Sequence, residues 1–567
     1  MFFKFFKNNL YLIAILLIAS FFRLYQLSSV PASLFGDEVD VGYQAYSILT
    51  TGRDYSSNFM PLHFHSLAEW RTPLYLYSAV PTVAIFGISP LGVRLPAVIF
   101  GILSIWGFYL LFRILTNNEK LAIIGSFLLS VNPWHLQYSR AGFEVTMLLT
   151  FLIFGLYFFF KDLKSGKYLG LSLLLLLLTP LIYSTAKLFT PALLLFLLIV
   201  YRKEIFNFPK KNLILSIVIG LLVGGLTTYA VLFSGGSQRF NYISVFSDPI
   251  TEPEIGVLRL NDAKARGETG TGLRPTIIDR AVHNKFVFWG ERISSNYLQS
   301  LGTDFLFING DPNPRHMMDN MGMFFKIDAI FLIFGTILFF ISKDQSIKNK
   351  TLIIFWILAG IMPAAITRDG GNHATRLMLI LPPLLFLISY GVMEILKKSK
   401  LIFLVIFGVL ILSFGYYLHM YYVHYPFNSE RWWHSGWEES ISEIKKIDSS
   451  YEKVIITMKD EPAWIFFAGW YEYDPVLWHK EFPIGNDVTL NGFGKISHTG
   501  KFYFGSPTDG IYSLGSSIDT KTLYLASSKE IPWNLILEPS LKPTGIKLIK
   551  SIAYPSGEPA FYLFTKE

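Results

Sequence analysis

Three carboxylates lie close together in the stretch SLFGDEVDVGYQAYSILTTGRD, residues 33–54. Asp37, Glu38 and Asp40 follow an apolar segment long enough to enter a lipid bilayer. Ionisable groups at membrane depth are costly, which makes them candidates for function. A carboxylate within hydrogen-bond distance of a hydroxyl can accept its proton, so Asp37 and Glu38 are candidate catalytic residues. The structural alternative is that these acids stabilise the N-terminus of an amphipathic helix, VDVGYQAYSILTTG.

Cationic side chains form the second group that could do chemistry. Arginine can hold phosphate oxygens through two parallel hydrogen bonds, and lysine acts as a point charge. At a membrane surface such residues would suit a substrate with an anionic head and an apolar tail. The candidates, together with a neighbouring acid, are Arg71, Arg94, Arg140, Glu144, Lys187, Arg315, His316, Arg368, His373 and Arg376.

Each of these residues also has an ordinary structural interpretation. Arg94 could extend its charge to the interface from a helix end. Arg140 and Glu144 are four residues apart and could form a pair on one helix face. Lys187 could be a helix-end lysine, and the other candidates could lie in solvated loops.

The composition gives little indication of a metal site and excludes cysteine chemistry. The chain contains no cysteine, which excludes disulfides, thiolate ligands and cysteine nucleophiles. His63 and His65 could bind a metal, but no clear third ligand accompanies them. We therefore assign no metal ligands, while acids with nearby histidines leave a divalent cation open.

The elements that must position these residues are membrane helices. Of the 567 residues, 52% are hydrophobic and only 16% are charged, and the mean hydropathy is +0.41. Soluble domains contain about 25% charged residues, so we expect a polytopic α-helical membrane protein. The first apolar run lacks a small-residue cleavage site and is interpreted as a retained helix rather than a signal peptide. About eleven segments fit a span of roughly 20 apolar residues, at about 9–27, 95–115, 120–138, 142–160, 168–184, 187–201, 212–233, 327–342, 351–367, 376–396 and 401–424.

Basic residues set the predicted orientation in the membrane. Their clusters fall in alternate loops, beginning with Lys4 and Lys7, so the positive-inside rule places the N-terminus in the cytoplasm and the tail outside. These clusters explain the net charge of +8 without a nucleic-acid partner. Residues 1–425 are predicted to form the transmembrane domain, with large outer loops at about 28–94 and 234–326. The absence of a eukaryotic signature favours a prokaryotic plasma membrane.

The tail from about 426 to 567 changes composition sharply and is predicted to be a small α/β accessory domain outside the membrane. Its aromatic run ERWWHSGW, residues 430–437, could stack on carbohydrate or form an interfacial belt. The apolar spacing predicts helices at 438–447 and 462–471, strands at 452–458, 500–505 and 522–527, and a hairpin at 546–566.

The order of motifs in the N-terminal part resembles that of the GT-C glycosyltransferases. The closest resemblance is to the protein O-mannosyltransferase and aminoarabinose-transferase-like group, which includes dolichyl-phosphate-mannose-protein mannosyltransferases. The matching motifs are DE at 37–38 in the first outer loop, TPLY at 72–75 and RLP at 94–96, where the second helix opens. The similarity extends over about residues 10–200 and is looser around ITRDGGNHATRLMLILPP. WRTPLY replaces the His-Pro-Pro-like sequence of many members.

This resemblance implies transfer of a sugar from a polyprenyl-phosphate donor to an acceptor outside the cytoplasm. Asp37, which matches the first acid of the family pair, would be the base, and Glu38 would orient groups around it. A departing lipid phosphate gains charge that cations can stabilise, and Arg94 is the cation that follows from the family match. The predicted topology alone suggests four more phosphate-binding residues, Arg140, Lys187, His316 and Arg376. Further candidate site residues are Arg71, Glu144, Arg315 and His373. One base and direct displacement predict inversion at the anomeric carbon.

Other functions remain open from the sequence. A lipid-linked-oligosaccharide transferase or polymer ligase would need similar residues. A transporter would also carry charges among its helices, although matched halves are expected there. A non-catalytic receptor that binds ligands through its tail is a further alternative. The acceptor could be a protein, a glycolipid or an envelope polymer.

Overall fold

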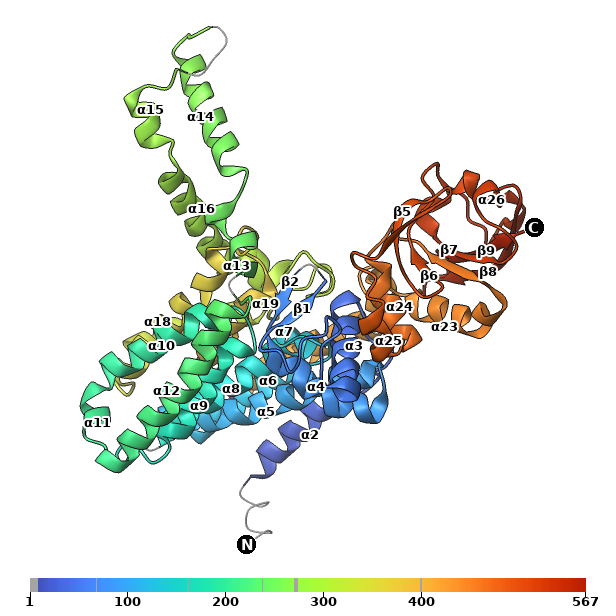
Figure 1. Ribbon diagram of the computed structural model, residues 1–567. Coiled ribbons are helices and arrows are strands. Elements are labelled where there is room, and N and C mark those ends of the chain that lie inside the picture. Colours follow the sequence, from blue (N-terminus) through green and yellow to red (C-terminus); the bar gives the residue numbers. More distant parts are fainter. Residues whose placement is uncertain (1–8, 68, 162, 237, 270–273, 398–399) are drawn as a thin grey trace. The chain divides into compact units, whose positions relative to one another are not determined.

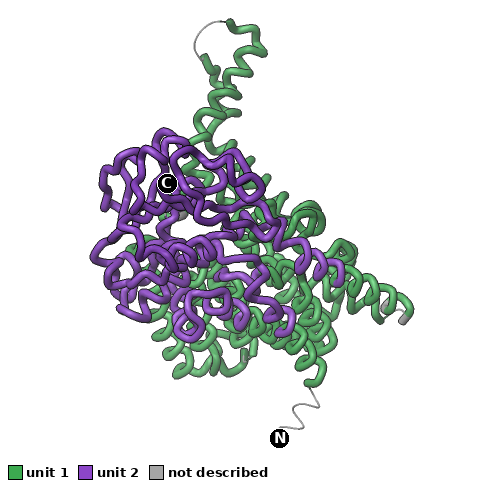
Figure 2. The backbone as a smooth tube through the Cα atoms, turned by 90° about the vertical axis from the view of Figure 1, so that its right-hand side faces the viewer, with its two compact units in different colours: residues 1–19, 101–137, 145–414 green, residues 20–100, 138–144, 415–567 purple. Residues whose placement is uncertain are grey.

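The computed structural model describes residues 9–67, 69–161, 163–236, 238–269, 274–397 and 400–567. Lys4, Lys7 and Lys398, which belong to the predicted cytoplasmic clusters, lie outside these residues. The chain divides into two compact units (Figure 2). Unit 1 comprises Met1–Ala19, Gly101–Gln137 and Val145–Phe414, and unit 2 comprises Ser20–Phe100, Tyr138–Glu144 and Gly415–Glu567.

Unit 1 is built from helices (Figure 1). Among its packed pairs are α17 with α20, α8 with α9, α9 with α12, α10 with α18 and α6 with α20. The bounds of its helices are α6 (Glu119–Val131), α8 (Val145–Lys161), α9 (Leu169–Leu178), α10 (Ala186–Val200), α11 (Arg202–Phe206), α12 (Lys210–Phe233), α13 (Gln238–Ile243), α14 (Thr251–Ala265), α15 (Ile277–Val282), α16 (Lys285–Ser300), α17 (Asp328–Ile341), α18 (Ile347–Ala365), α19 (Ala374–Leu377) and α20 (Leu381–Leu396). Four further helices cross the boundaries between the units in sequence: α2 (Leu10–Leu24), α5 (Pro90–Thr116), α7 (Pro133–Tyr138) and α21 (Lys400–His419).

Glycine allows the closest of these helix packings. A Cβ at Gly335 of α17 would lie 1.9 Å from the carbonyl oxygen of Leu387 in α20. A Cβ at Gly391 of α20 would lie 2.3 Å from the carbonyl oxygen of Phe331. Small residues at crossings let membrane helices approach backbone to backbone. The two glycines therefore define the α17–α20 contact.

Membrane-spanning helices are present, as predicted. Among the described residues, five helices are long and apolar enough to cross a bilayer. The α12 helix has an exposed apolar surface, with Leu221 71% and Leu222 69% exposed. Every one of the eleven predicted segments contains a helix. The five long helices are Pro90–Thr116, Lys210–Phe233, Ile347–Ala365, Ala374–Leu396 and Leu404–Asn428.

The segment predicted as a polar outer loop at 234–326 is largely helical. Helices α14 and α16 pack against each other, with the short α15 between them in sequence, and form an arm of unit 1 (Figure 1). A capping box of Thr276 and Asp279 begins α15. The arm was missed because its helices mix polar and apolar residues and contain no long apolar run.

Unit 2 combines the first outer loop with the C-terminal region. Its helix α3 (Gly36–Thr51) is the predicted amphipathic segment, and it packs against α4 (Pro73–Phe86) and α24 (Ala463–Tyr471). Two short antiparallel strands, β1 (Phe64–Ser66) and β2 (Glu69–Arg71), lie between α3 and α4 in the chain. The boundary predicted at 425/426 falls inside the third segment of this unit.

The C-terminal region contains a seven-stranded mixed sheet in the order β4-β5-β6-β3-β7-β9-β8. The predicted strands and hairpin correspond to β3 (Lys453–Ile456), β6 (Phe502–Phe504), β7 (Thr522–Ser527), β8 (Ile546–Ala553) and β9 (Pro559–Lys566). The predicted helices correspond to α23 (Trp437–Ile447) and α24. Strands β4 (Asp487–Leu490) and β5 (Gly494–Thr499) and helix α25 (Pro475–Lys480) were not predicted.

Candidate functional site

The acidic stretch opens helix α3. Phe35 is the N-cap residue, with extended backbone, and the N–H of Gly36 donates to Nδ1 of His434 at 3.2 Å. Asp37 and Glu38 lie in the first turn, where the helix dipole favours negative charge. Burial separates the adjacent acids, because Glu38 and Asp40 are fully buried whereas Asp37 is half-exposed.

Glu38 is bound to Arg94. The Nε of Arg94 lies 2.8 Å from Oε1 of Glu38, and an Nη lies 2.9 Å from Oε2. The backbone N–H of Gly142 also donates to Oε1, at 2.6 Å. Both side chains are completely buried, so this is an ion pair in the interior of unit 2.

Arg94 uses all of its donors inside unit 2. Beyond Glu38, its two Nη atoms donate to three backbone carbonyl oxygens, and the five N–H groups of the guanidinium are thereby occupied. Its guanidinium also lies 5.3 Å from the ring centre of Trp433. Trp433 is buried, packs edge-on against Phe35 and donates to the hydroxyl of Tyr425. The three carbonyl acceptors belong to Leu27, Pro31 and Ser33.

Asp40 belongs to a second buried network. Arg71 lies between Asp40, at 3.2 Å, and Glu144, at 2.5 Å. The hydroxyl of Ser66 donates to Asp40 at 2.7 Å. Burial raises the pKa of Asp40 to about 6, against the opposing charge of Arg71 and the hydrogen bond from Ser66. Glu144 therefore pairs with Arg71 of another segment.

Asp37 differs from its neighbours in having an uncommitted carboxylate. Its backbone carbonyl accepts from Arg71 at 2.8 Å. In the described part of the chain, no hydrogen bond or ion pair of its side chain is present, although the charge of Arg71 acts on it. Asp37 is thus the one acid of the stretch with lone pairs open to an external hydroxyl.

Arg140 is also fully buried and supports the backbone. It donates to the carbonyl oxygens of Phe22 at 2.6 Å and Val30 at 2.8 Å. The rings of Tyr421 and Tyr422 each lie 5.3 Å from its guanidinium. These contacts explain why an arginine is retained in the interior of unit 2.

Unit 1 brings two of the predicted phosphate ligands into one cavity. Lys187 of α10 and Arg376 of α19 both line a cavity of about 230 Å³. Lys187 donates to the carbonyl oxygen of Gly236, and Arg376 donates to the hydroxyl of Thr367, each at 2.7 Å. The other lining residues include two hydroxyl side chains and five apolar ones: Ser184, Thr185, Leu188, Val231, Phe240, Ile243 and Pro363.

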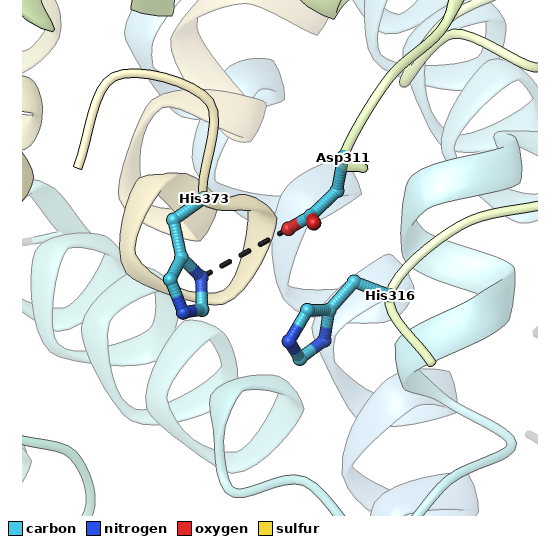
Figure 3. Close-up of side chains that lie close together, drawn as sticks. All are labelled: Asp311, His316 and His373. Atoms are coloured by element: carbon cyan, nitrogen blue, oxygen red, sulfur yellow. Dashed lines mark ion pairs between the residues drawn. The ribbon is translucent and has the colours of Figure 1, made fainter. Parts of the chain in front are cut away.

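A further cluster in unit 1 consists of Asp311, His316 and His373 (Figure 3). Burial raises the pKa of Asp311 to about 6 and lowers that of His316 to about 3, where Arg315 and Arg376 add repulsion. His316 is therefore neutral at physiological pH. Arg315 lies in the same loop, and its backbone carbonyl accepts from the side chain of Gln137 at 2.7 Å.

These three side chains could hold a metal ion, a ligand set that the sequence analysis did not find. His316 and His373 were candidates for other roles, and Asp311 was missed. No spacing motif joins these residues, because His373 lies in a different segment from the other two. The only sequence signal was the repeated occurrence of histidine next to arginine or asparagine in polar loops.

Residues 71–224 match the family of dolichyl-phosphate-mannose-protein mannosyltransferases. No protein with a curated description matches the chain. Among solved structures, ArnT from Cupriavidus metallidurans bound to undecaprenyl phosphate matches 98% of this chain and 97% of its own, at 10% identity and a TM-score of 0.51.

Two other glycosyltransferase structures are similar over smaller shares. The archaeal oligosaccharyltransferase AglB from Archaeoglobus fulgidus, in complex with an inhibitory peptide and a dolichol-phosphate, is 14% identical with a TM-score of 0.47. The match covers 83% of this chain but only 64% of that enzyme, so the chain spans less than two thirds of its length. The S. cerevisiae protein O-mannosyltransferase Pmt1-Pmt2 complex bound to the sugar donor is 17% identical over 41% of this chain and 34% of its own, with a TM-score of 0.32. The family match and the ArnT-like fold confirm the resemblance of this chain to the GT-C glycosyltransferases of the protein O-mannosyltransferase and aminoarabinose-transferase-like group.

Proposed function

We propose that this protein is an inverting glycosyltransferase that moves a sugar from a polyprenyl-phosphate donor to an acceptor hydroxyl. The transfer takes place on the outer face of a prokaryotic plasma membrane, which the chain crosses about eleven times with its N-terminus in the cytoplasm. The donor class is supported by the mannosyltransferase family match and by the undecaprenyl phosphate bound to ArnT. Residues 426–567 then serve as an accessory domain outside the membrane.

The observation that carries this proposal is the distribution of partners among the three acids of α3. Glu38 is neutralised by Arg94, and Asp40 by Arg71, whereas the Asp37 carboxylate is uncommitted and half-exposed. A base must be both reachable and ionised to accept a proton. Asp37 alone among these acids meets the first condition.

The reaction follows from this assignment. Asp37 takes the proton of the acceptor hydroxyl as its oxygen attacks the anomeric carbon. The bond between that carbon and the donor phosphate oxygen breaks, and both electrons leave with the lipid phosphate. Attack opposite the leaving group inverts the configuration. The two buried ion pairs, Glu38 with Arg94 and Arg71 with Asp40, hold the first turn of α3 and so orient Asp37.

The departing phosphate needs cations that hold its growing charge. Lys187 and Arg376 are assigned this role because they line one cavity with three hydroxyl side chains and an apolar wall. The apolar wall suits the adjoining prenyl chain. Arg94 and Arg140, by contrast, have their donors directed at partners in the interior of unit 2, which suits a positioning role.

The reaction can be tested with the purified full-length protein in lipid nanodiscs. A panel of polyprenyl-phosphate hexoses and pentoses is supplied with candidate acceptors, and released lipid phosphate and the anomeric configuration of the product are measured. We expect one donor to be consumed with inversion. A retained configuration would contradict direct displacement, and release of no lipid phosphate from any donor would contradict the function.

Asp37→Asn tests the base within the same assay. Removing a general base lowers the rate by about 10²–10⁴-fold, while donor binding should persist because the cavity residues are unchanged. Asp509→Asn is the matched control, since Asp509 is an exposed aspartate of the C-terminal region. Full activity in Asp37→Asn would refute the assignment.

A further inference from the structure

Two segments far apart in sequence bring a carboxylate and two imidazoles together in unit 1. Asp311 and His316 lie in the loop that follows the π-helix Asp304–Ile308, and His373 immediately precedes α19. One ligand atom from each side chain lies within 4.8 Å of the others. Figure 3 shows the three groups directed toward a common space.

The cluster is held in place by its surroundings. The Asp311 carboxylate accepts one backbone N–H from Asn313 at 2.8 Å and one from Ala374 at 2.7 Å. The second of these bonds joins the loop to the segment that carries His373. Nδ1 of His316 lies 3.4 Å from the hydroxyl of Thr375. Such supporting contacts orient ligand side chains in metal sites.

Nδ1 of His373 and Oδ2 of Asp311 form a long ion pair at 3.9 Å, which is beyond hydrogen-bond distance (Figure 3). The two imidazole rings are 5.1 Å apart between centres and are tilted by 38° rather than stacked. The spacing leaves room for a small ion among the three groups.

We propose that Asp311, His316 and His373 bind a divalent metal ion, and that the ion is Zn²⁺ or another late first-row cation. Imidazole nitrogen favours such ions, whereas Mg²⁺ and Ca²⁺ prefer oxygen ligands throughout. Metal–ligand bonds of about 2.0–2.2 Å place tetrahedral ligands roughly 3.4 Å apart. The three ligand atoms, which lie within 4.8 Å of one another, therefore have to approach by up to about 1.4 Å. The fourth position is left for water or a substrate oxygen.

The bound ion links the 311–316 loop to α19. Arg376 follows His373 by one helical turn, so the ion would hold the backbone that presents Arg376 to its cavity. This consequence for Arg376 rests on the proposed function, whereas metal binding itself does not. The two are therefore tested by different measurements.

Metal binding is measured on the full-length protein carrying a purification tag without histidine. After treatment with a chelator, the protein is titrated with Co²⁺ and followed by visible absorption, and zinc content is determined by mass spectrometry after reloading. We expect one equivalent of Zn²⁺ and a saturable Co²⁺ spectrum, with two nitrogen and one oxygen protein ligands by X-ray absorption. His316→Ala, His373→Ala and Asp311→Asn should each weaken binding by at least about tenfold.

The Asp262→Asn/His283→Ala double variant is the matched control. Asp262 and His283 form a carboxylate–imidazole pair at 2.9 Å, and no third metal-ligating group joins them among the described residues. This variant should bind as the unchanged protein does. A wild-type protein without a saturable Co²⁺ spectrum would overturn the proposal even if a ligand variant failed to fold. Equal loss of binding in the control would also overturn it.

Discussion

At the scale of single residues, the first turn of α3 places adjacent acids in opposite environments. Successive side chains of a helix are rotated by about 100°. Glu38 therefore points into the interior of unit 2, whereas Asp37 points toward its surface. Glu38 meets a guanidinium there that is also fully buried. A buried charge without a partner is strongly destabilising. The acids of this stretch therefore fall into two kinds: carboxylates held in buried ion pairs, and a carboxylate that can still bind an external hydroxyl.

This division predicts opposite effects of two neighbouring substitutions. Glu38→Gln leaves Arg94 charged and buried without its counter-ion, which should lower the free energy of unfolding by about 3–5 kcal/mol. Asp37→Asn removes a half-exposed carboxylate that has no ion-pair partner among the described residues, so its stability should change little. Thermal unfolding in detergent, followed by circular dichroism, measures both. Equal stability of Glu38→Gln and the unchanged protein would contradict the structural role of the pair.

These residues could be identified from the amino-acid sequence, but their roles could not. Residue type and position indicated that Asp37 and Glu38 lie at the start of a helix, and that an arginine opens the second apolar segment. The contact between Glu38 and Arg94 depends on tertiary packing, which no local spacing encodes. The same limit applies to Asp311, whose partner His373 lies in a separate segment. For Lys187 and Arg376, the predicted topology indicated only that both begin apolar segments on the outer side. It did not indicate that they line one cavity.

At the scale of elements, the close crossing of α17 and α20 can be tested directly. Gly335→Ala places a methyl group where the carbonyl oxygen of Leu387 now lies, 1.9 Å from the ideal Cβ position. Overpacking of this kind costs about 1–3 kcal/mol, and the helices must separate. The melting temperature in detergent should fall, and the variant should express less well.

Gly225→Ala is the matched control for this crossing. Gly225 lies in α12, and no described atom outside its own helix turn lies within 4 Å of an added Cβ. Alanine is also the better helix former, so stability should be equal or slightly higher. If Gly335→Ala were as stable as Gly225→Ala, the backbone contact would not limit the crossing.

The elements themselves were largely predictable, for physical reasons that also explain the exceptions. A bilayer demands long apolar segments, and all eleven predicted segments contain helices. Strands with continuous apolar runs, such as β7, were found because they are buried on both faces. The strand β4 alternates exposed and half-buried positions at the edge of the sheet, and its weak pattern was missed. The α14–α16 arm was missed because its helices mix polar and apolar residues and contain no long apolar run.

At the scale of the whole molecule, the absence of cysteine makes the membrane orientation testable. Each cysteine introduced into this chain is the only thiol present. Ser516→Cys in the tail, Glu268→Cys in the arm and Lys203→Cys in α11 place that thiol at exposed positions. The basic clusters predict that the first two positions lie outside and the third lies in the cytoplasm.

The measurement is labelling with a membrane-impermeant maleimide in right-side-out vesicles, before and after permeabilisation. Ser516→Cys and Glu268→Cys should react at once, whereas Lys203→Cys should react only after the membrane is opened. Because the three variants share one background, differences in reactivity report access rather than chemistry, and labelling in denaturant corrects for expression. Immediate labelling of Lys203→Cys, with protection of the other two positions, would show that the true orientation is the reverse of the predicted one. It would then place Asp37 on the cytoplasmic side, where a transfer outside the membrane could not use it.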